Sequence, residues 1–483
     1  MTVANEAQKS NELRREALGL GFIIFFVISA AGPLVAIAGG VPIGIMLGNG
    51  AGTPALIVAT VVILLAFSAG YTSMARYVTN AGGFYAFAAR GLGGGVGGAA
   101  ALLALLGYNT MQIGLYGMFG TVASGFLAQH LGIAVPWWVC AFAAMASIAV
   151  FGYRQIDLSA KVLSVLVIGE YLVVLVLDVA ILKVGGAAGP TLVPFTQHAV
   201  LSGTPAVGLL FCFAMFIGFE ATTIYSEEAK NPHRTIPLAT YLSVLLIGGF
   251  YAFSVWCMVV GAGADSIVKI ISGLQDPTTF LYSLSDHYAN RSLTLAMSVL
   301  FITSVYAGLL AFHNSAARYF FASGREGLLP KALGRTHPTH QSPHNGSLLQ
   351  SALAAVVVLL FAIAGSDPVL TLFSWLTNVA TLCVIALMAL TSFAVIRYFR
   401  HADAGADEGA LRVVVLPLLS GIALTAVLLF AIANFSVLTG ASKTLSYALT
   451  VSLPVAAIIG FLLAGRLRMR NPVLFSKLGN SKL

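Results

Sequence analysis

Long runs of apolar residues, separated by short polar segments, dominate the hydrophobic pattern of this chain. Many extend over about 18 residues or more, which is enough for a helix to cross the hydrocarbon of a bilayer. The alternating ten-residue segments of a membrane β-barrel are missing from the sequence. The pattern predicts an all-α membrane protein with twelve transmembrane helices. The expected limits are Leu18–Leu47, Pro54–Tyr77, Gly95–Ala128, Val135–Tyr153, Asp157–Lys183, Thr204–Ser226, Ile236–Gly261, Ser292–Phe321, Ser347–Ala364, Pro368–Ile396, Val413–Phe435 and Leu445–Leu467.

The distribution of Lys and Arg over the connecting segments predicts the topology. An even number of spans places both termini on the same side of the membrane. With both termini inside, the inner segments hold 21 Lys and Arg residues and the outer segments hold four. Basic residues concentrate on the cytoplasmic side of membrane proteins. We therefore predict a multi-pass protein of the cell (cytoplasmic) membrane with both termini in the cytoplasm.

Composition excludes several other classes of protein. The 483 residues are 58% hydrophobic and only 9% charged, whereas soluble domains carry about 25% charged residues. The net charge of +8 lies in loops and tail, so it indicates topology and lipid headgroups rather than a nucleic-acid partner. The four cysteines lie in apolar runs without a CxxC pair. We therefore expect no disulfide and no metal site. The histidines are concentrated in loops and show no metal-ligand spacing in the spans, so we also expect no cofactor and no catalytic cluster and predict that the chain is not an enzyme.

Two spans contain residues that interrupt a helix. The first span carries Gly32 and Pro33, and proline removes a helical hydrogen bond and clashes with the preceding turn. The sixth span carries Gly218 just before Glu220. Irregular backbone at membrane depth persists only where protein or a water-filled cavity satisfies it. Interruptions at matching positions of two repeats indicate the binding site of a transporter.

The interruptions of spans one and six lie at matching positions if spans one to five and spans six to ten are two repeats. Because five is odd, the second repeat would be inverted in the membrane. The predicted organisation is an N-terminal tail, a first five-helix repeat, a second, inverted repeat, two additional helices and a C-terminal tail. Their limits are 1–17, 18–183, 204–396, 413–467 and 468–483. The glycine-rich segment 91–98 predicts close helix packing.

Three motifs resemble the amino acid–polyamine–organocation (APC) permeases. Phe216-Ile-Gly-Phe-Glu220, followed by Ser226-Glu-Glu-Ala-Lys-Asn-Pro-His-Arg-Thr-Ile-Pro237, is similar to the family's sixth span. Ala81-Gly-Gly-Phe-Tyr85 resembles its loop between spans two and three, and Arg318-Tyr-Phe-Phe-Ala-Ser-Gly-Arg-Glu-Gly-Leu-Leu-Pro330 resembles its loop after span eight. The resemblance covers spans one to ten. It implies the leucine-transporter-type fold of five plus five inverted helices with two added.

The resemblance also implies where a substrate binds. In the family, backbone groups at the two interruptions hold the amino and carboxylate groups of an amino acid. The corresponding residues here are Ser29, Ala30, Ala31, Gly32, Ile217, Gly218 and Phe219. The family's usual glycine-serine-glycine of span one is replaced here by Ser29-Ala-Ala-Gly-Pro33, which leaves open a substrate without a carboxylate.

Two carboxylates are candidates for coupling transport to an ion. Glu220 follows the sixth-span interruption, and Glu170 lies at the centre of the fifth span, where many family members carry a lysine. Ionisable residues at membrane depth are costly and commonly functional. We predict H⁺ as the coupling ion, with Na⁺ as the alternative. The alternative for each residue is a carboxyl held by hydrogen bonds to neighbouring helices.

Further candidates lie in the third, sixth and eighth spans. Tyr108 and Gln112 share one helix face, and Gln112 matches a pocket position of the family. Phe312 matches an aromatic pocket position, and Phe216 matches an outer gate. Interhelical hydrogen bonding and ordinary packing are the respective alternatives. By resemblance, the charged run 227–234 belongs to the inner gate, with Arg76 or Arg90 as its partner.

The sequence therefore predicts a secondary active transporter that moves amino acids or related amines by alternating access. A polyamine or amine importer, or an amino acid–amine exchanger, is the alternative. A channel or a membrane-embedded enzyme is a remote one. The predicted partners are a small-molecule substrate and the lipid bilayer, and the oligomeric state stays open.

Overall fold

The computed structural model describes residues 18–154, 157–401 and 408–480, and all regular structure in these ranges is helical. These ranges contain twelve helical segments that are long and apolar enough to cross a membrane. The prediction of an all-α membrane protein with twelve spans is confirmed. The predicted limits lie within a few residues of the observed helix ends.

The helices follow the predicted order along the chain. The first five spans are α2 (Leu20–Ala31) with η1 (Val35–Gly40) and α3 (Val41–Leu47), α4 (Thr53–Ala75), α6 (Gly94–Phe126), α7 (Trp137–Arg154) and α8 (Asp157–Val184). The next five are α10 (Pro205–Ala214) with η5 (Phe219–Thr223), α11 (Pro232–Ala262), α14 (Arg291–Arg325), α15 (His344–Ile363), and η7 (Pro368–Phe373) with α16 (Ser374–His401). The last two are η9 (Leu411–Val415) with α17 (Leu416–Ala433), and α19 (Lys443–Arg470).

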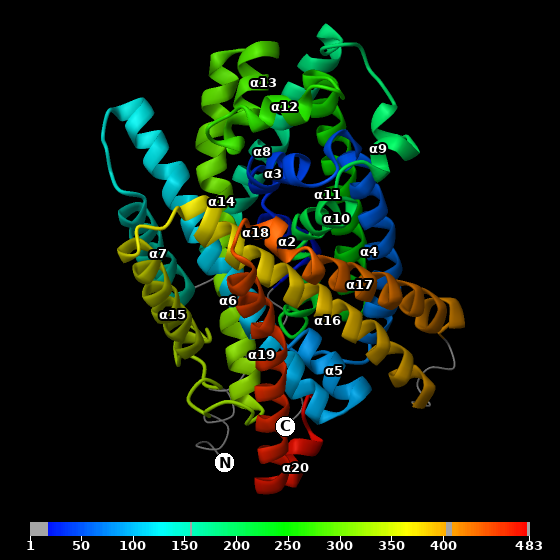
Figure 1. Ribbon diagram of the computed structural model, residues 1–483. Helices are drawn as coiled ribbons and strands as arrows, with labels where there is room; N and C mark the ends of the chain where they lie inside the picture. Colours follow the sequence, from blue (N-terminus) through cyan, green and yellow to red (C-terminus); the bar gives the residue numbers. More distant parts are fainter. Residues whose placement is uncertain (1–17, 155–156, 402–407, 481–483) are drawn as a thin grey trace.

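Shorter helices lie in the connections and at the C-terminal end. They are η2 (Gly50–Gly52), α5 (Phe84–Leu92), η3 (Leu127–Leu131), η4 (Val193–Phe195), α9 (Gln197–Leu201), α12 (Ile267–Ser272), η6 (Pro277–Thr279), α13 (Phe280–Tyr288), α18 (Phe435–Thr439) and α20 (Pro472–Ser476). In Figure 1, α12 and α13 cover the upper end of the bundle, while α5 and α20 lie at the lower end.

The long helix α6 packs against α14, α16 and α19, and α11 packs against α2, α4 and α8. Side chains on the outer faces are apolar and exposed, for example Leu360 of α15, Leu429 of α17 and Leu462 of α19. This distribution is the inverse of that in a soluble protein and is expected for helices that face lipid. Polar side chains are instead buried between the helices, and they define the functional site.

Both described ends of the chain lie at the same end of the bundle. The Leu18 N–H donates to the Glu228 carbonyl oxygen (3.0 Å), and the Gly479 N–H donates to Glu326 Oε2 (2.6 Å). Glu228 binds Arg318 of α14, and Glu326 directly follows the last residue of that helix. An even number of spans produces this arrangement.

Helices α6 and α19 approach each other at a pair of glycines. A Cβ atom added to Gly98 would lie 2.4 Å from the Gly460 carbonyl oxygen, and one added to Gly460 would lie 2.1 Å from that of Gly98. Such contacts leave no space for a side chain, so glycine permits the two backbones to touch. The close packing expected of the glycine-rich segment 91–98 occurs here.

We expect Gly460→Val to destabilise the protein, because the added side chain must separate α19 from α6. Overpacking of this kind costs about 1–3 kcal/mol, which a thermal unfolding assay in detergent would detect. Gly465→Val on the same helix is the matched control, since an added Cβ atom at Gly465 meets no atom within 4 Å. Equal melting temperatures for the two variants would contradict the close contact.

Candidate functional site

The first span is interrupted where the sequence predicts it. Helix α2 ends at Gly32, which adopts the left-handed conformation (φ +53°), and Pro33 follows without an N–H group. The chain then continues as the π-helix η1 and the helix α3. A left-handed residue next to a proline breaks the regular hydrogen-bond ladder, so backbone groups near Gly32 need other partners.

Protein side chains supply two of these partners. The Leu34 N–H donates to Glu170 Oε2 of α8 (3.3 Å), and the Tyr251 hydroxyl of α11 donates to the Ala31 carbonyl oxygen (3.2 Å). Glu170 thus accepts from the first free amide after the interruption and sits near the N-terminus of the second half of span one. Its carboxylate suits the positive end of a helix.

The second interruption lies in span six. Helix α10 ends at Ala214, Gly218 adopts φ +115°, and the 3₁₀-helix η5 begins at Phe219. A Cβ atom added to Gly218 would lie 2.6 Å from the Ala30 Cβ atom. The two interruptions are therefore in direct contact, and glycine is required both for the backbone conformation and for this approach.

Glu220 organises the second interruption. Its Oε2 accepts from the Gly218 N–H (2.9 Å), and its Oε1 accepts from the Tyr108 hydroxyl of α6 (2.7 Å). The Glu220 carbonyl oxygen accepts from the Tyr71 hydroxyl of α4 (2.8 Å). Glu220 is almost fully buried. This carboxyl therefore links span six to spans two and three.

A cavity of about 80 Å³ adjoins the two interruptions. Such a volume holds several water molecules. Its polar side chains, Ser374, Thr377 and Asn378, all come from the start of α16. The other lining residues are apolar or glycine: Ala30, Ala31, Val35, Ala36, Gly40, Ile43, Met111, Leu115, Phe211, Ala214, Met215, Ile217, Gly308, Phe312 and Phe373.

The cavity contains some of the predicted binding residues. Ala30, Ala31, Ile217 and Phe312 line it. The other predicted binding residues lie outside the lining: Ser29, Gly32, Gly218, Phe219, Gln112 and Tyr108. The predicted coupling residues Glu170 and Glu220 and the predicted gate Phe216 are also outside it. Their functional roles stay predictions.

Gln112 belongs to a buried polar network instead. Its Nε2 lies 3.1 Å from His313 Nδ1 of α14, and its Oε1 accepts from Gln350 of α15. His313 Nε2 in turn lies 2.7 Å from the Ser347 hydroxyl. The arrangement matches the interhelical hydrogen bonding that was the alternative for Gln112, and it joins spans three, eight and nine.

The predicted gate Phe216 is buried against α11. Its ring lies edge-on to that of Tyr251, with the centroids 5.9 Å apart. Tyr251 is the residue that donates to the Ala31 carbonyl oxygen. Phe216 therefore connects the two interruptions through one shared aromatic neighbour.

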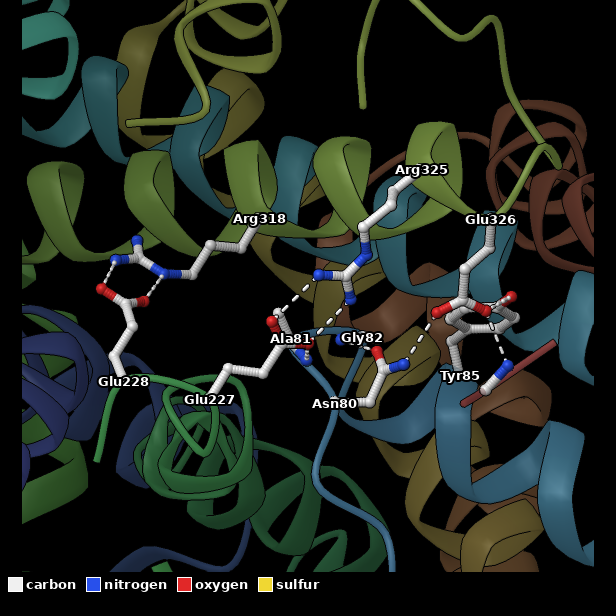
Figure 2. Close-up of polar contacts among 10 residues, drawn as sticks. Asn80, Ala81, Gly82, Tyr85, Glu227, Glu228, Arg318, Arg325 and Glu326 are labelled. Carbon is white, nitrogen blue, oxygen red and sulfur yellow. Dashed lines mark hydrogen bonds and ion pairs between the residues drawn. The ribbon is translucent and has the colours of Figure 1, made fainter. Parts of the chain in front are cut away.

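Two ion pairs close the end of the bundle that carries Leu18 and Gly479 (Figure 2). Arg318 of α14 binds Glu228 in a bidentate manner, with Nε–Oε1 and Nη2–Oε2 distances of 2.8 and 3.2 Å. Arg325 binds Glu227 similarly, at 3.0 and 2.7 Å. The Arg318 guanidinium also lies 4.6 Å from the centre of the Tyr225 ring. These contacts join the segment after span six to span eight.

The predicted partners of the charged run 227–234 are wrong. Arg76 pairs with Glu408 (3.2 Å), and Arg90 is exposed. Glu227 and Glu228 reach Arg325 and Arg318 because the segment after η5 lies along the C-terminal end of α14, as Figure 2 shows. Pairing between residues about 90 positions apart follows from the fold and has no local signal in the sequence.

Sequence reasoning gave no functional role to two carboxyls that the structure buries. Asp178 of α8 accepts from the Ser254 hydroxyl of α11 (2.6 Å) and is buried. Glu326 accepts from Tyr85, Asn80 and Gly479 at 2.5, 2.7 and 2.6 Å. Burial raises the pKa of the Glu326 carboxyl, and these hydrogen bonds act against that shift. The signal for Asp178 was its position within an apolar span, and Glu326 lies in the motif Arg318–Pro330 that carries the family resemblance.

Comparison with known proteins assigns the family. The sequence profile of a family described as amino acid permease matches residues 18–463. The chain belongs to the amino acid permease family. This membership confirms the resemblance carried by the three motifs.

Three relatives illustrate the range of the permease family. The low-affinity putrescine importer PlaP of Escherichia coli is 24% identical over 61% of this chain and 65% of its own length. The branched-chain amino acid permease BcaP of Bacillus subtilis is 27% identical over 73% of this chain and 76% of its own. The human cationic amino acid transporter 4 is 29% identical over 40% of this chain and 28% of its own. These relatives are transporters, not enzymes.

We expect Arg318→Met to lower the stability of the permease by about 3–5 kcal/mol, because Glu228 would remain buried without a counter-charge. The double variant Arg318→Met/Glu228→Leu should recover most of this loss, since it leaves no buried charge behind. Thermal unfolding of the single and double variants in detergent measures both effects.

The pair of Arg76 with Glu408 provides a comparison, because 39% of the Arg76 side chain is exposed although only 6% of the Glu408 side chain is. Since water reaches the Arg76 side chain, Arg76→Met should cost less than Arg318→Met. A double variant as unstable as Arg318→Met, or an equally large effect of Arg76→Met, would contradict a stabilising role specific to the buried pair.

Proposed function

We propose that this permease is a secondary active transporter that carries an amino acid or a related amine across the cell membrane by alternating access. The observation that carries the proposal is the contact of two interrupted spans beside one cavity, with Gly218 against Ala30. Interrupted helices at matching positions of a transporter hold substrate near the bilayer midplane. The names of the relatives support the two substrate classes.

The proposed topology has two inverted five-helix repeats followed by two further helices. Its support is the spacing of the interrupted spans, which are spans one and six. The excess of Lys and Arg in the inner segments supports cytoplasmic termini. The end closed by the Arg318 and Arg325 ion pairs is then cytoplasmic, and those pairs are the contacts that must separate when the site opens inwards.

Glu170 is the proposed coupling residue. It is fully buried, and Oε2 is committed to the Leu34 N–H, whereas Oε1 has no hydrogen-bond partner of regular geometry among the described residues. An uncompensated carboxylate in such surroundings is costly, so a bound proton or Na⁺ would stabilise this site. Binding there would act directly on the second half of span one. We take H⁺ as the ion and Na⁺ as the alternative.

We expect reconstituted protein to accumulate a labelled neutral amino acid when an inward proton gradient is imposed. Glu170→Gln removes the exchangeable proton but keeps the acceptor for the Leu34 N–H. This variant should therefore lose gradient-driven accumulation while it retains exchange of labelled for unlabelled substrate. Uptake and counterflow in proteoliposomes measure the two activities separately.

Asp265→Asn is the matched control, because Asp265 is an exposed carboxyl outside the spans. Full accumulation by Glu170→Gln would remove Glu170 from coupling. Accumulation that follows a Na⁺ gradient rather than a pH gradient would assign the other ion. Failure to transport any amino acid or amine would overturn the proposed function itself.

A further inference from the structure

The walls of the cavity differ from those that a cationic substrate needs. Among the residues that the structure describes, no Asp, Glu, Lys, Arg or His lines the cavity. Glu220, the buried carboxyl nearest in sequence to the lining residue Ile217, is bound to Tyr108 and Gly218. A second ammonium group of a substrate would lose its hydration here without meeting a counter-charge. Removal of an ion from water without a partner costs several kcal/mol.

The three polar side chains of the lining also direct donors at backbone carbonyl oxygens, two of them within their own span. The Thr377 hydroxyl donates to the Phe373 carbonyl oxygen (2.7 Å), and Asn378 Nδ2 donates to that of Ser374 (2.7 Å). The Ser374 hydroxyl donates to the Leu438 carbonyl oxygen (3.4 Å). The cavity therefore presents mainly apolar surface, provided by such residues as Met111 and Phe312.

We infer that the cavity receives a neutral substrate with an apolar side chain and discriminates against diamines and cationic amino acids. The inference rests on the proposed function and specifies the substrate class of the same site. The backbone at the two interruptions holds the polar end of the substrate, and the apolar walls hold its side chain. Burial of that side chain favours binding in proportion to the apolar surface removed from water.

Competition against a labelled neutral amino acid tests the inference. Leucine and methionine should compete at least about tenfold better than arginine or putrescine in the wild-type protein. Asn378→Asp places a counter-charge in the cavity at nearly constant volume. It should improve competition by arginine and putrescine, relative to leucine, by about tenfold or more.

Asn109→Asp is the matched control. Asn109 Nδ2 donates to the carbonyl oxygen four residues earlier (Leu105, 2.7 Å), as Asn378 Nδ2 does, but Asn109 does not line the cavity. The control should leave the order of competitors unchanged. Equal or better competition by putrescine or arginine in the wild type would overturn the inference but not the transporter proposal. An unchanged order in Asn378→Asp would also count against it.

A separate observation concerns the C-terminal segment. Leu478 is buried, and the Gly479 N–H donates to Glu326 Oε2 (2.6 Å). A Cβ atom added to Gly479 would lie 2.9 Å from the Ala86 carbonyl oxygen of α5. Residues 478–479 thus pack into a site formed by α5 and the end of α14, although they follow the last span.

Glu326 connects this segment to the ion pairs. It also accepts from Asn80 Nδ2 (2.7 Å) and from the Tyr85 hydroxyl (2.5 Å), as Figure 2 shows. The next residue of that loop, Ala81, donates its N–H to Glu227 Oε1 (2.9 Å), and Glu227 pairs with Arg325. One loop therefore contacts both the C-terminal segment and an ion pair that closes this end.

We propose that residues 478–479 act as a latch that stabilises the closed state of this end. Separation of Glu227 from Arg325 displaces the loop at Asn80, so Glu326 loses hydrogen-bond partners. The contact between Glu326 and the Gly479 N–H is then weakened. The latch contributes to the free energy of the closed state only, so its loss shifts the population towards the open state.

Thiol accessibility of a cysteine placed in the cavity tests the latch. The four native cysteines are replaced, and Ala31→Cys supplies the single thiol. The protein is reconstituted into vesicles in one orientation by means of an N-terminal tag. An impermeant maleimide is then added on the side of the C-terminus. Gly479→Val and Leu478→Asp, which displace the segment, should each increase the labelling rate at least about threefold.

Lys477→Ala is the control, because Lys477 is exposed although it directly precedes Leu478. This variant should leave the labelling rate unchanged. The melting temperature of each variant verifies that the bundle remains folded. Unchanged labelling in both displaced variants would overturn the latch. An equal increase in Lys477→Ala would do the same, because the effect would then not depend on the buried contacts.

Discussion

The structure depends on one constraint: backbone polar groups freed inside a membrane must find partners within the protein. Gly32 and Pro33 interrupt the first span, and the Leu34 N–H and Ala31 carbonyl oxygen are then satisfied by Glu170 and Tyr251. These two side chains come from spans five and seven. The interruption is therefore a junction of three spans, with its free backbone groups held by side chains from two other spans.

The same constraint explains why the two interruptions touch. Gly218 approaches Ala30 so closely that no side chain fits, and Glu220 folds back to accept the Gly218 N–H. Tyr108 and Tyr71 then hold Glu220 from spans three and two. Each interruption is thus supported by a buried carboxyl, which compensates locally for lost helical hydrogen bonds. Movement of one half-helix changes the contacts of the other.

Features with a local cause could be predicted from the sequence. Hydropathy gives the twelve spans, and Gly32, Pro33 and Gly218 mark the interruptions, because backbone conformation depends on the residue itself. Partners across the bundle could not be predicted. Glu228 pairs with Arg318, and Gln112 joins a network with His313, because helices distant in sequence are neighbours in the fold. The family motifs contain Glu228 and Arg318 but do not assign their contacts.

Charge is separated from the cavity along the bundle, and this separation has an energetic reason. In the part of the chain that the structure describes, the cavity walls carry no ionisable side chain, whereas Arg318, Arg325, Glu227 and Glu228 gather at one end. At that end, ions released from a pair as the end opens would gain hydration, which would reduce the cost of separating them. Ion pairs inside the cavity would have no such compensation. A closure that must open repeatedly is therefore best built at the end of the bundle, with an apolar cavity behind it.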